Sequence, residues 1–315
     1  MSDRPRADRI PAAVRLPAAD PLPAADPLQV AGPHDDPGRP DGYGPGWSAA
    51  RRRVDEATLR AWLAFAHAAC DEADATALAN FRRDIEVVRK PDRSFVTAAD
   101  EGIERAIRER IRASYPDHGL VGEEYGDRDA AGATRWYIDP IDATHNFIRG
   151  IPIFGTLLAV EVDGEVQAGV ISAPAMRERW YAARGIGAWS RGLDGERRIH
   201  VSRVAAVPDA QLVYGSGRQA AASGLMPGFD ALMAAAWRER GFGDFWGYTL
   251  VAEGAAEAML ETGIHRWDLA APQVLIEEAG GRVTDVDGER RIDAPSFVAT
   301  NGLVHDEVLR RLRGG

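Results

Sequence analysis

The stretch that decides the fold is WYIDPIDATHNF, at residues 136–147. Its first three residues are apolar and predict the end of a buried strand, and Asp139 and Asp142 follow at once. Pro140 favours an extended backbone at Asp139 and removes one backbone donor. Two carboxylates at a strand end, with the carbonyl group of Ile141 between them, are the oxygen ligands that a hard divalent cation prefers.

A short helix is expected to begin near Thr144, directly after these aspartates. The free amides at the start of that helix would face the same strand end and would hold a phosphate group. A cation and a phosphate at one strand end form the arrangement of a phosphoryl-transfer site. Taken alone, however, a D-x-x-D spacing arises by chance in a chain with 48 acidic residues, and a solvated turn is then the simpler interpretation.

Three further acidic segments accompany this stretch. Gly122-Glu123-Glu124 follows a short apolar strand, and alone it would be a surface turn. The segment WDLAA at 267–271 leads into EAGG at 278–281, where Asp268 alone would be a helix N-cap. The segment KPDRSFVTAAD at 90–100 opens a helix, with Thr97 and Asp100 in the form of a capping box.

Outward from these motifs, helical and strand-like patterns alternate, which predicts layered helices and sheets of an α+β or α/β class. The expected helices span 55–83, 97–111, 245–254, 268–279 and 304–312. The expected strands span 120–121, 136–138, 154–162, 165–172, 179–184, 187–189, 256–261, 282–286 and 297–300. Asp163-Gly164 is a strong hairpin signal between the third and fourth of these strands.

Composition excludes several classes of protein. The 315 residues are 45% hydrophobic and 27% charged, as in ordinary globular proteins, and 38 basic residues against 48 acidic ones give a formal charge of −10. That balance disfavours a nucleic-acid partner. No apolar run approaches the roughly 18 residues of a membrane helix, and no signal-peptide pattern is visible, so the expected location is cytoplasmic with no membrane partner.

The sequence also lacks the usual marks of other chemistries. One cysteine, Cys70, excludes an internal disulfide and a cysteine-rich zinc site, and its mid-helix position argues against a thiol nucleophile. No P-loop and no complete dinucleotide fingerprint occur. The seven histidines are scattered singly, so carboxylate chemistry remains.

Residues 1–46 hold 10 of the 19 prolines, with LPAADP twice in tandem. A segment so poor in bulky apolar residues predicts a disordered tail, with a proline-rich docking ligand as the alternative. A folded domain is expected at 47–315, divided into an α+β part (47–200) and an α/β part (201–315).

Taken together, the four acidic segments resemble the inositol monophosphatase superfamily of Mg²⁺-dependent, lithium-sensitive phosphatases. Its marks are V-T-x-x-D, G-E-E, D-P-[IL]-D-[GS]-T-x-N-F and W-D-x-A-A…E-A-G-G, found here at 96–100, 122–124, 139–147 and 267–281. The resemblance covers residues 50–312. It implies a layered α-β-α-β-α sandwich, usually homodimeric, that takes a small phosphorylated substrate.

Further segments are most similar to the histidinol-phosphate phosphatases of this type: NFIRGIP at 146–152, SAPA at 172–175, WYAARG at 180–185, RGFGDFW at 240–246 and ATNG at 299–302. This resemblance implies hydrolysis of L-histidinol phosphate, a step of histidine biosynthesis. An inositol monophosphatase or a related cyclitol or sugar phosphatase is the alternative, because Gly263-Ile264-His265 is closer to inositol phosphatases. A non-catalytic phosphate-binding scaffold is the third possibility.

The resemblance also implies a role for each site residue. One Mg²⁺ would be held by Glu123, Asp139 and the Ile141 carbonyl group, a second by Asp139, Asp142 and Asp268, and a third, weaker ion beside Glu123. Thr144, oriented by Asp100, would position the attacking water, and no covalent phosphoenzyme is expected. The residues implied in substrate binding are Glu123, Asp142, Ala143, Thr144, Arg240 and Asp268, with the amides of Ala143 and Thr144 on the phosphate.

Three positions depart from the family pattern. Ala143 stands where the family has Gly, and we expect a negative φ there, which makes the methyl group harmless; a positive φ would cost about 1 kcal/mol. His145 replaces Lys, Thr or Arg and is expected to be a partly exposed helix residue, and Phe95 stands where Pro is frequent. For the cationic amine of histidinol phosphate, Glu124 or Asp244 is the expected carboxylate partner.

Overall fold

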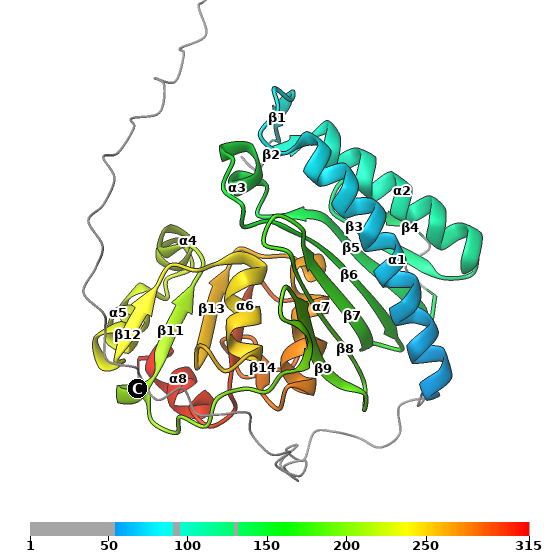
Figure 1. Cartoon of the computed structure of the whole chain (residues 1–315). Helices are drawn as coiled ribbons and strands as arrows, with labels where there is room; N and C mark the ends of the chain where they lie inside the picture. The colour runs from blue at the N-terminus through cyan, green and yellow to red at the C-terminus, as the bar shows by residue number, and fades with distance from the viewer. Residues whose placement is uncertain (1–53, 91–94, 129–131, 315) are drawn as a thin grey trace, which may run out of the picture. The chain divides into compact units, whose positions relative to one another are not determined.

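The computed structural model describes residues 54–90, 95–128 and 132–314 of the chain (Figure 1). The tail predicted at residues 1–46 lies outside these ranges. None of the helices within them is long and apolar enough to cross a membrane.

The larger sheet has eight strands in the order β10-β9-β8-β7-β6-β5-β3-β4. They are β3 (Gly119–Gly122), β4 (Gly126–Arg128), β5 (Thr134–Asp142), β6 (Gly155–Val162), β7 (Glu165–Ala173), β8 (Glu178–Ala183), β9 (Gly187–Gly192) and β10 (Gly195–Arg198). The predicted turn between β6 and β7 is confirmed, since Asp163 and Gly164 both have positive φ, at 52° and 80°. Among the described strands of this sheet, only β3 and β5 pair in parallel, with Gly122 beside Ile138. Their carboxyl ends therefore meet at one edge of the sheet.

The smaller sheet has five strands in the order β12-β11-β13-β15-β14. They are β11 (Gln211–Tyr214), β12 (Arg238–Arg240), β13 (Ala258–Thr262), β14 (Arg282–Thr284) and β15 (Ser296–Thr300), and a separate hairpin joins β1 (Val87–Arg89) to β2 (Phe95–Thr97). All strands of the larger sheet come before residue 200 in the sequence, and all strands of the smaller sheet come after it. A domain division at that point stays a prediction.

Three clusters of buried apolar side chains form the cores between the layers. Along β6, Leu158 packs with the helices α1 (Glu56–Asn80) and α2 (Ala98–Ser114) on one face of the larger sheet. Leu157 points to the other face, where it packs with α6 (Asp244–Ala252) and α7 (Arg266–Glu278), which also cover the smaller sheet. The far face of the smaller sheet packs against α5 (Met226–Ala235) and α8 (His305–Leu312). The layered α-β-α-β-α sandwich is confirmed (Figure 1).

The local signals for the long helices are confirmed. Asp55 caps α1 by accepting a hydrogen bond from the amide of Thr58 (2.9 Å), and the helix ends at Asn80, three residues before the predicted end. Thr97 and Asp100 form the predicted capping box of α2.

The pattern between residues 201 and 244 did not predict the elements found there. These are a short 3-10 helix (Val207–Asp209), β11, α4 (Gly217–Ala222), α5 and β12. Helix α5 contains Pro227 and Gly228, which usually interrupt helices. Pro227 is tolerated in the first turn, and Gly228 is needed because a Cβ there would lie 2.2 Å from the carbonyl oxygen of Leu312.

The seat of α7 on the larger sheet depends on a close approach of backbones. A Cβ at Gly169 of β7 would lie 2.9 Å from the Cα of Ala271 in α7, too close for any side chain. Only small residues on both sides allow this contact. The contact holds α7 against β7, which is separated from β5 by β6 alone.

Candidate active site

The candidate site lies where β5 ends. The strand finishes at Asp142, Ala143 is the N-cap of the next helix, and α3 (Thr144–Arg149) begins at the residue expected from the sequence. The parallel pairing of β3 with β5 brings Glu123 to the same edge, where its amide donates to the carbonyl oxygen of Ile138 (3.3 Å). The first amides of α3 have no acceptor within the helix.

Two further helices direct their N-termini to this place. The carboxylate of Asp142 accepts a hydrogen bond from the amide of Phe245 in the first turn of α6 (2.6 Å). Asp268 is the third residue of α7 and accepts from the amide of His265 (2.7 Å), which completes a capping box. Thus the segments at 122–124, 139–147 and 267–271 meet, although up to 145 residues separate Glu123 from Asp268.

Several negatively charged carboxylates lie close together at the end of β5. Asp139 is 2% exposed, and its Oδ1 atom has no hydrogen-bond partner. Burial, followed by the repulsion of Glu123, Asp142 and Asp268, raises the pKa of Asp139 well above its usual range. Burial and then repulsion from Glu123 raise the pKa of Asp268 to about 7. Buried carboxylates whose pKa is raised by neighbouring negative charge fit a divalent cation with oxygen ligands.

The carboxylates are nevertheless turned to other partners. Among the described residues, no group of three or more His, Cys, Asp or Glu side chains is arranged to hold a metal ion as it stands. Glu123 and Glu124 both accept hydrogen bonds from Lys90, at 2.9 and 2.7 Å, while Asp142 and Asp268 are held by backbone amides. The ligand roles of Glu123, Asp139, Ile141, Asp142 and Asp268 therefore stay predictions.

Asp100 and Thr144 lie beside these carboxylates. One oxygen of Asp100 accepts from the amide of Thr97 (2.9 Å), and the other is 3.5 Å from the hydroxyl group of Thr144. The Thr144 hydroxyl donates to the carbonyl oxygen of Ile141 (2.9 Å). Burial raises the pKa of Asp100 to about 6, so this carboxylate is ionised near neutral pH and can orient the hydroxyl.

The predicted negative φ at Ala143 is wrong. Ala143 has φ 65° and ψ 44°, in the left-handed region, because the chain must turn sharply from β5 into α3. A side chain in this conformation costs roughly 1–2 kcal/mol, which explains why glycine is the family residue here. The methyl group is 7% exposed and packs in the core below α1 and α2.

The remaining predicted residues lie as follows. Arg240 is half-buried at the end of β12, where its guanidinium group donates to the carbonyl oxygen of Glu239 (2.6 Å), and its role stays a prediction. His145 is exposed and meets the ring of Phe95 edge-on, with ring centres 5.2 Å apart. Cys70 is fully buried, and burial raises its pKa to about 12, as expected of a thiol that is not a nucleophile.

The sequence did not single out Lys90, Tyr248 or Glu261. Burial and then repulsion from Asp244 raise the pKa of Glu261 to about 8. Its carboxylate accepts from the hydroxyl group of Tyr248 (2.7 Å) and from the amide of Asp244 (3.3 Å). The available signal was an acidic residue at the end of the strand that leads to Asp268.

Comparison with known proteins agrees with this geometry. A sequence model of the inositol monophosphatase family matches residues 58–314. The chain belongs to the inositol monophosphatase family. A histidinol-phosphatase of Mycobacterium tuberculosis is 43% identical over 256 residues, which cover 80% of this chain and 98% of that protein. A histidinol-phosphatase of Streptomyces coelicolor is 39% identical over 253 residues, which cover 78% and 95%.

A solved structure of an inositol monophosphatase from Anabaena (Nostoc) gives a TM-score of 0.71 at 30% identity and covers 82% of this chain and 97% of that one. The chain is thus a phosphatase of the inositol monophosphatase family, whose members generally depend on Mg²⁺. The resemblance deduced from the four acidic segments is confirmed.

Replacing Ala143 with glycine should change the free energy of unfolding by less than about 1 kcal/mol. Relief of the left-handed strain, about 1–2 kcal/mol, offsets the lost methyl group and the greater freedom of unfolded glycine. Ala69→Gly, at a buried position of ordinary helical geometry in α1, is the matched control and should cost about 2 kcal/mol. Urea unfolding of both variants measures the difference, and equal losses would contradict the strain.

Without metal, the protein should become less stable as the pH rises from about 4 to 7. Folded Asp268 keeps its proton up to about pH 7, whereas the unfolded carboxyl group loses it near pH 4, so the unfolded chain binds fewer protons in this range. Melting temperatures in chelator and in Mg²⁺ test this, and Mg²⁺ should stabilise more at about pH 7.5 than at about pH 5. Asp268→Asn should flatten both responses; a melting temperature of the metal-free protein that rises with pH would refute the argument.

Proposed function

We propose that this phosphatase hydrolyses L-histidinol phosphate to L-histidinol and phosphate, the phosphatase step of histidine biosynthesis. The observation that carries the proposal is the 43% identity to the M. tuberculosis histidinol-phosphatase over 98% of that protein's length. The segment RGFGDFW at 240–246, which begins α6 beside Asp142, supports the same substrate. A homodimer in the cytoplasm is part of the proposal.

Glu123, Asp139 and the Ile141 carbonyl group would hold one Mg²⁺, and Asp139, Asp142 and Asp268 a second. A third ion would lie beside Glu123. The mutual repulsion of these carboxylates and the unpartnered Oδ1 atom of Asp139 support this assignment. When bound, Mg²⁺ supplies positive charge that offsets the phosphate dianion and makes a bound water more acidic.

The chain's own groups would orient the reactants. The amides of Ala143 and Thr144, at the start of α3, would donate to the phosphate oxygens. The Thr144 hydroxyl lies between Asp100 and the Ile141 carbonyl oxygen, so it can donate to one of them and accept a hydrogen bond from the attacking water. Arg240 would approach the phosphate or the substrate from β12.

Asp244 is the better partner for the substrate's cationic amine. Glu124 is already paired with Lys90 at 2.7 Å, and its side chain is only 5% exposed. Asp244 is half-buried at the start of α6, and it raises the pKa of Asp142, which places its negative charge beside the proposed metal ligands. An ammonium group there would relieve that repulsion, whereas the neutral hydroxyl groups of inositol would not.

The alternative substrate is inositol 1-phosphate or a related sugar phosphate. The match to the Anabaena inositol monophosphatase and the segment Gly263-Ile264-His265 support it. Its hydroxyl groups would require neutral or acceptor side chains where histidinol carries a charge.

The deciding experiment measures phosphate release from L-histidinol phosphate and from inositol 1-phosphate, with Mg²⁺ and with chelator. We expect Mg²⁺-dependent hydrolysis with kcat/KM at least tenfold higher for histidinol phosphate. Asp139→Asn, which removes the charge of the bridging carboxylate, should fold and lose nearly all turnover. Equal or faster hydrolysis of inositol 1-phosphate would overturn the proposed substrate, and no Mg²⁺-dependent hydrolysis of any monoester would leave the phosphate-binding scaffold.

Asp244→Asn should raise KM for histidinol phosphate about tenfold or more, because a charge-assisted hydrogen bond to the amine is lost. KM for inositol 1-phosphate should stay within about twofold. Steady-state kinetics of both substrates measure the ratio. Glu124→Gln is the control and should leave that ratio unchanged; a shift in Glu124→Gln and none in Asp244→Asn would reverse the assignment.

A further inference from the structure

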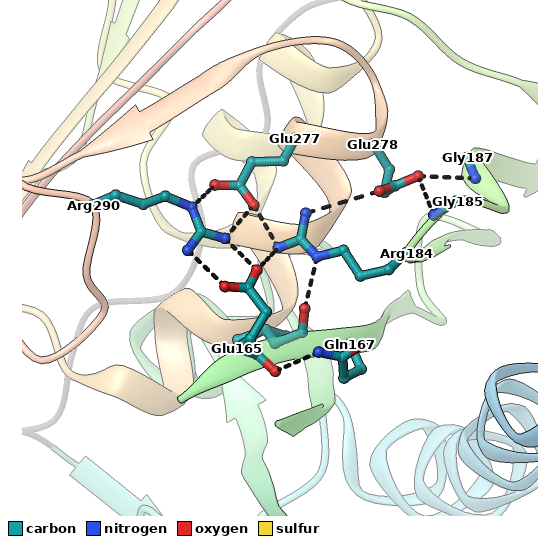
Figure 2. Close-up of polar contacts among 9 residues, drawn as sticks. Glu165, Gln167, Arg184, Gly185, Gly187, Glu277, Glu278 and Arg290 are labelled. Atoms are coloured by element: carbon teal, nitrogen blue, oxygen red, sulfur yellow. Dashed lines mark hydrogen bonds and ion pairs between the residues drawn. The ribbon is translucent and has the colours of Figure 1, made fainter. Parts of the chain in front are cut away.

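Five charged side chains meet at the C-terminal end of α7, on the opposite end of the helix from Asp268 (Figure 2). They come from four separate segments: Glu165 at the start of β7, Arg184 after β8, Glu277 and Glu278 at the end of α7, and Arg290 between β14 and β15. The two strand segments from the larger sheet and the loop of the smaller sheet thus hold one helix end between them. We call these five residues the α7 clamp.

Arg290 binds two carboxylates as a fork. Its guanidinium nitrogens lie 2.9 and 2.5 Å from the two oxygens of Glu165, and 2.5 and 2.8 Å from the two oxygens of Glu277. Bidentate pairs of this kind fix the direction as well as the distance of approach. Arg290 therefore fixes both the distance and the orientation of the Glu277 carboxylate relative to that of Glu165.

Arg184 closes the other side of the clamp. It is 2.5 Å from Glu277, 2.9 Å from Glu165 and 3.8 Å from Glu278, and it also donates to the carbonyl oxygen of Val166 (2.8 Å). Glu278 accepts from the amide of Gly185 (3.0 Å) in the turn after β8. The exposed fraction of the Arg184, Glu165, Glu277 and Glu278 side chains is 10% or less.

Stability alone does not explain such a group. Burying ions costs free energy that their attraction seldom exceeds, and apolar side chains of the same volume are often as stable or more stable. What a buried group of ions does supply is one preferred position of the helix along its axis. Any displacement of the helix end would leave a buried charge without its partner. An apolar contact would tolerate small slides of α7.

The position of α7 matters because the helix carries Asp268. Nine residues separate Asp268 from Glu277, which corresponds to about 14 Å along the helix axis. Pro272 removes the helical hydrogen bond to the Asp268 carbonyl oxygen, but α7 continues without a break from Arg266 to Glu278. A shift at the clamp is thus transmitted to the Asp268 carboxylate.

The first turn of α7 has a weaker tie of its own. Arg266 pairs with Asp127 of β4, but these side chains are 32% and 43% exposed. Exposed pairs contribute little and are screened by salt. The clamp is therefore the more buried of the two ionic contacts on the helix.

We propose that the α7 clamp is a positioning device that sets the place of Asp268 in the active site. The proposal rests on the metal role assigned to Asp268 under the proposed function. Arg184, Glu165, Glu277, Glu278 and Arg290 act through α7 and touch neither substrate nor metal.

The experiment measures Mn²⁺ binding to the full-length protein by electron paramagnetic resonance of the free ion, together with kcat, KM and melting temperature. Glu277→Gln removes one charge from the clamp with little change in volume. Arg290→Lys is the milder variant, since it keeps the charge, loses the fork, and lies at a 29% exposed side chain where folding is less at risk. We expect both to weaken Mn²⁺ binding, by at least fivefold for Glu277→Gln and by a smaller factor for Arg290→Lys, and to lower kcat more than they change KM.

Asp74→Asn is the matched control. Asp74 on α1 forms a similar ion pair with Arg179 of β8 at 2.6 Å, with side chains 18% and 12% exposed, and its other hydrogen-bond partner is Ser172 of β7. It should lower the melting temperature as the clamp variants do, while Mn²⁺ affinity and kcat stay within twofold. This comparison separates a positioning effect from general destabilisation.

Three outcomes overturn the proposal. If Asp268→Asn weakens Mn²⁺ binding and Glu277→Gln and Arg290→Lys do not, the clamp is not a positioning device. The same conclusion follows if Asp74→Asn weakens Mn²⁺ binding as much as the clamp variants do at an equal loss of melting temperature. If Asp268→Asn itself leaves Mn²⁺ binding unchanged, the metal role of Asp268 is wrong and the proposal falls with it.

Discussion

Repulsion between carboxylates at one end of the larger sheet is the constraint on which the rest of the structure depends. Burial and neighbouring carboxylates raise the pKa of Asp139, Asp142 and Asp268, and Asp139 has an oxygen with no hydrogen-bond partner. Such a concentration of negative charge persists only where the surrounding fold holds it in place. The fold does this with backbone amides at the starts of α6 and α7, with Lys90, and with the parallel pair of β3 and β5.

Different layers position different parts of the carboxylate site at the end of β5. The cluster below α1 and α2 fixes the strand that ends in the aspartates, and the cluster around α6 and α7 brings two helix N-termini to it. The contact of Gly169 with Ala271 sets the distance of α7 from the sheet, and the charged residues at its far end oppose sliding along its axis. Distance and register are thus controlled by different chemistry, one steric and one ionic.

Most of the features that could be predicted from the sequence depend on residues close together in the chain. The capping box at Thr97 and Asp100, the Asp163-Gly164 hairpin and the helix start at Thr144 each depend on a few neighbouring residues, and each is confirmed. Helix α5 was missed because Pro227 and Gly228 interrupt its helical pattern, and the other elements between 201 and 244 are only three to six residues long. The negative φ expected at Ala143 failed because few residues other than glycine adopt the left-handed region, so alanine gave no local warning.

Contacts between distant segments could not be predicted in the same way. The hydrogen bond from Phe245 to Asp142 and the ion pair of Arg290 with Glu165 join residues more than 100 positions apart. No periodicity encodes such pairs, since they arise only once the layers are packed. The partner of Glu124 was equally hidden, and knowing that it is Lys90 is what turns attention to Asp244.

Asp100 both caps a helix and contacts a proposed catalytic residue, so its substitution affects folding as well as activity. One of its oxygens closes the start of α2, and the other faces the hydroxyl group of Thr144. Inactive alleles at this codon would therefore combine poor folding with poor chemistry, and an activity screen on its own would attribute both to catalysis. Cellular abundance has to be scored alongside turnover before any such allele is interpreted.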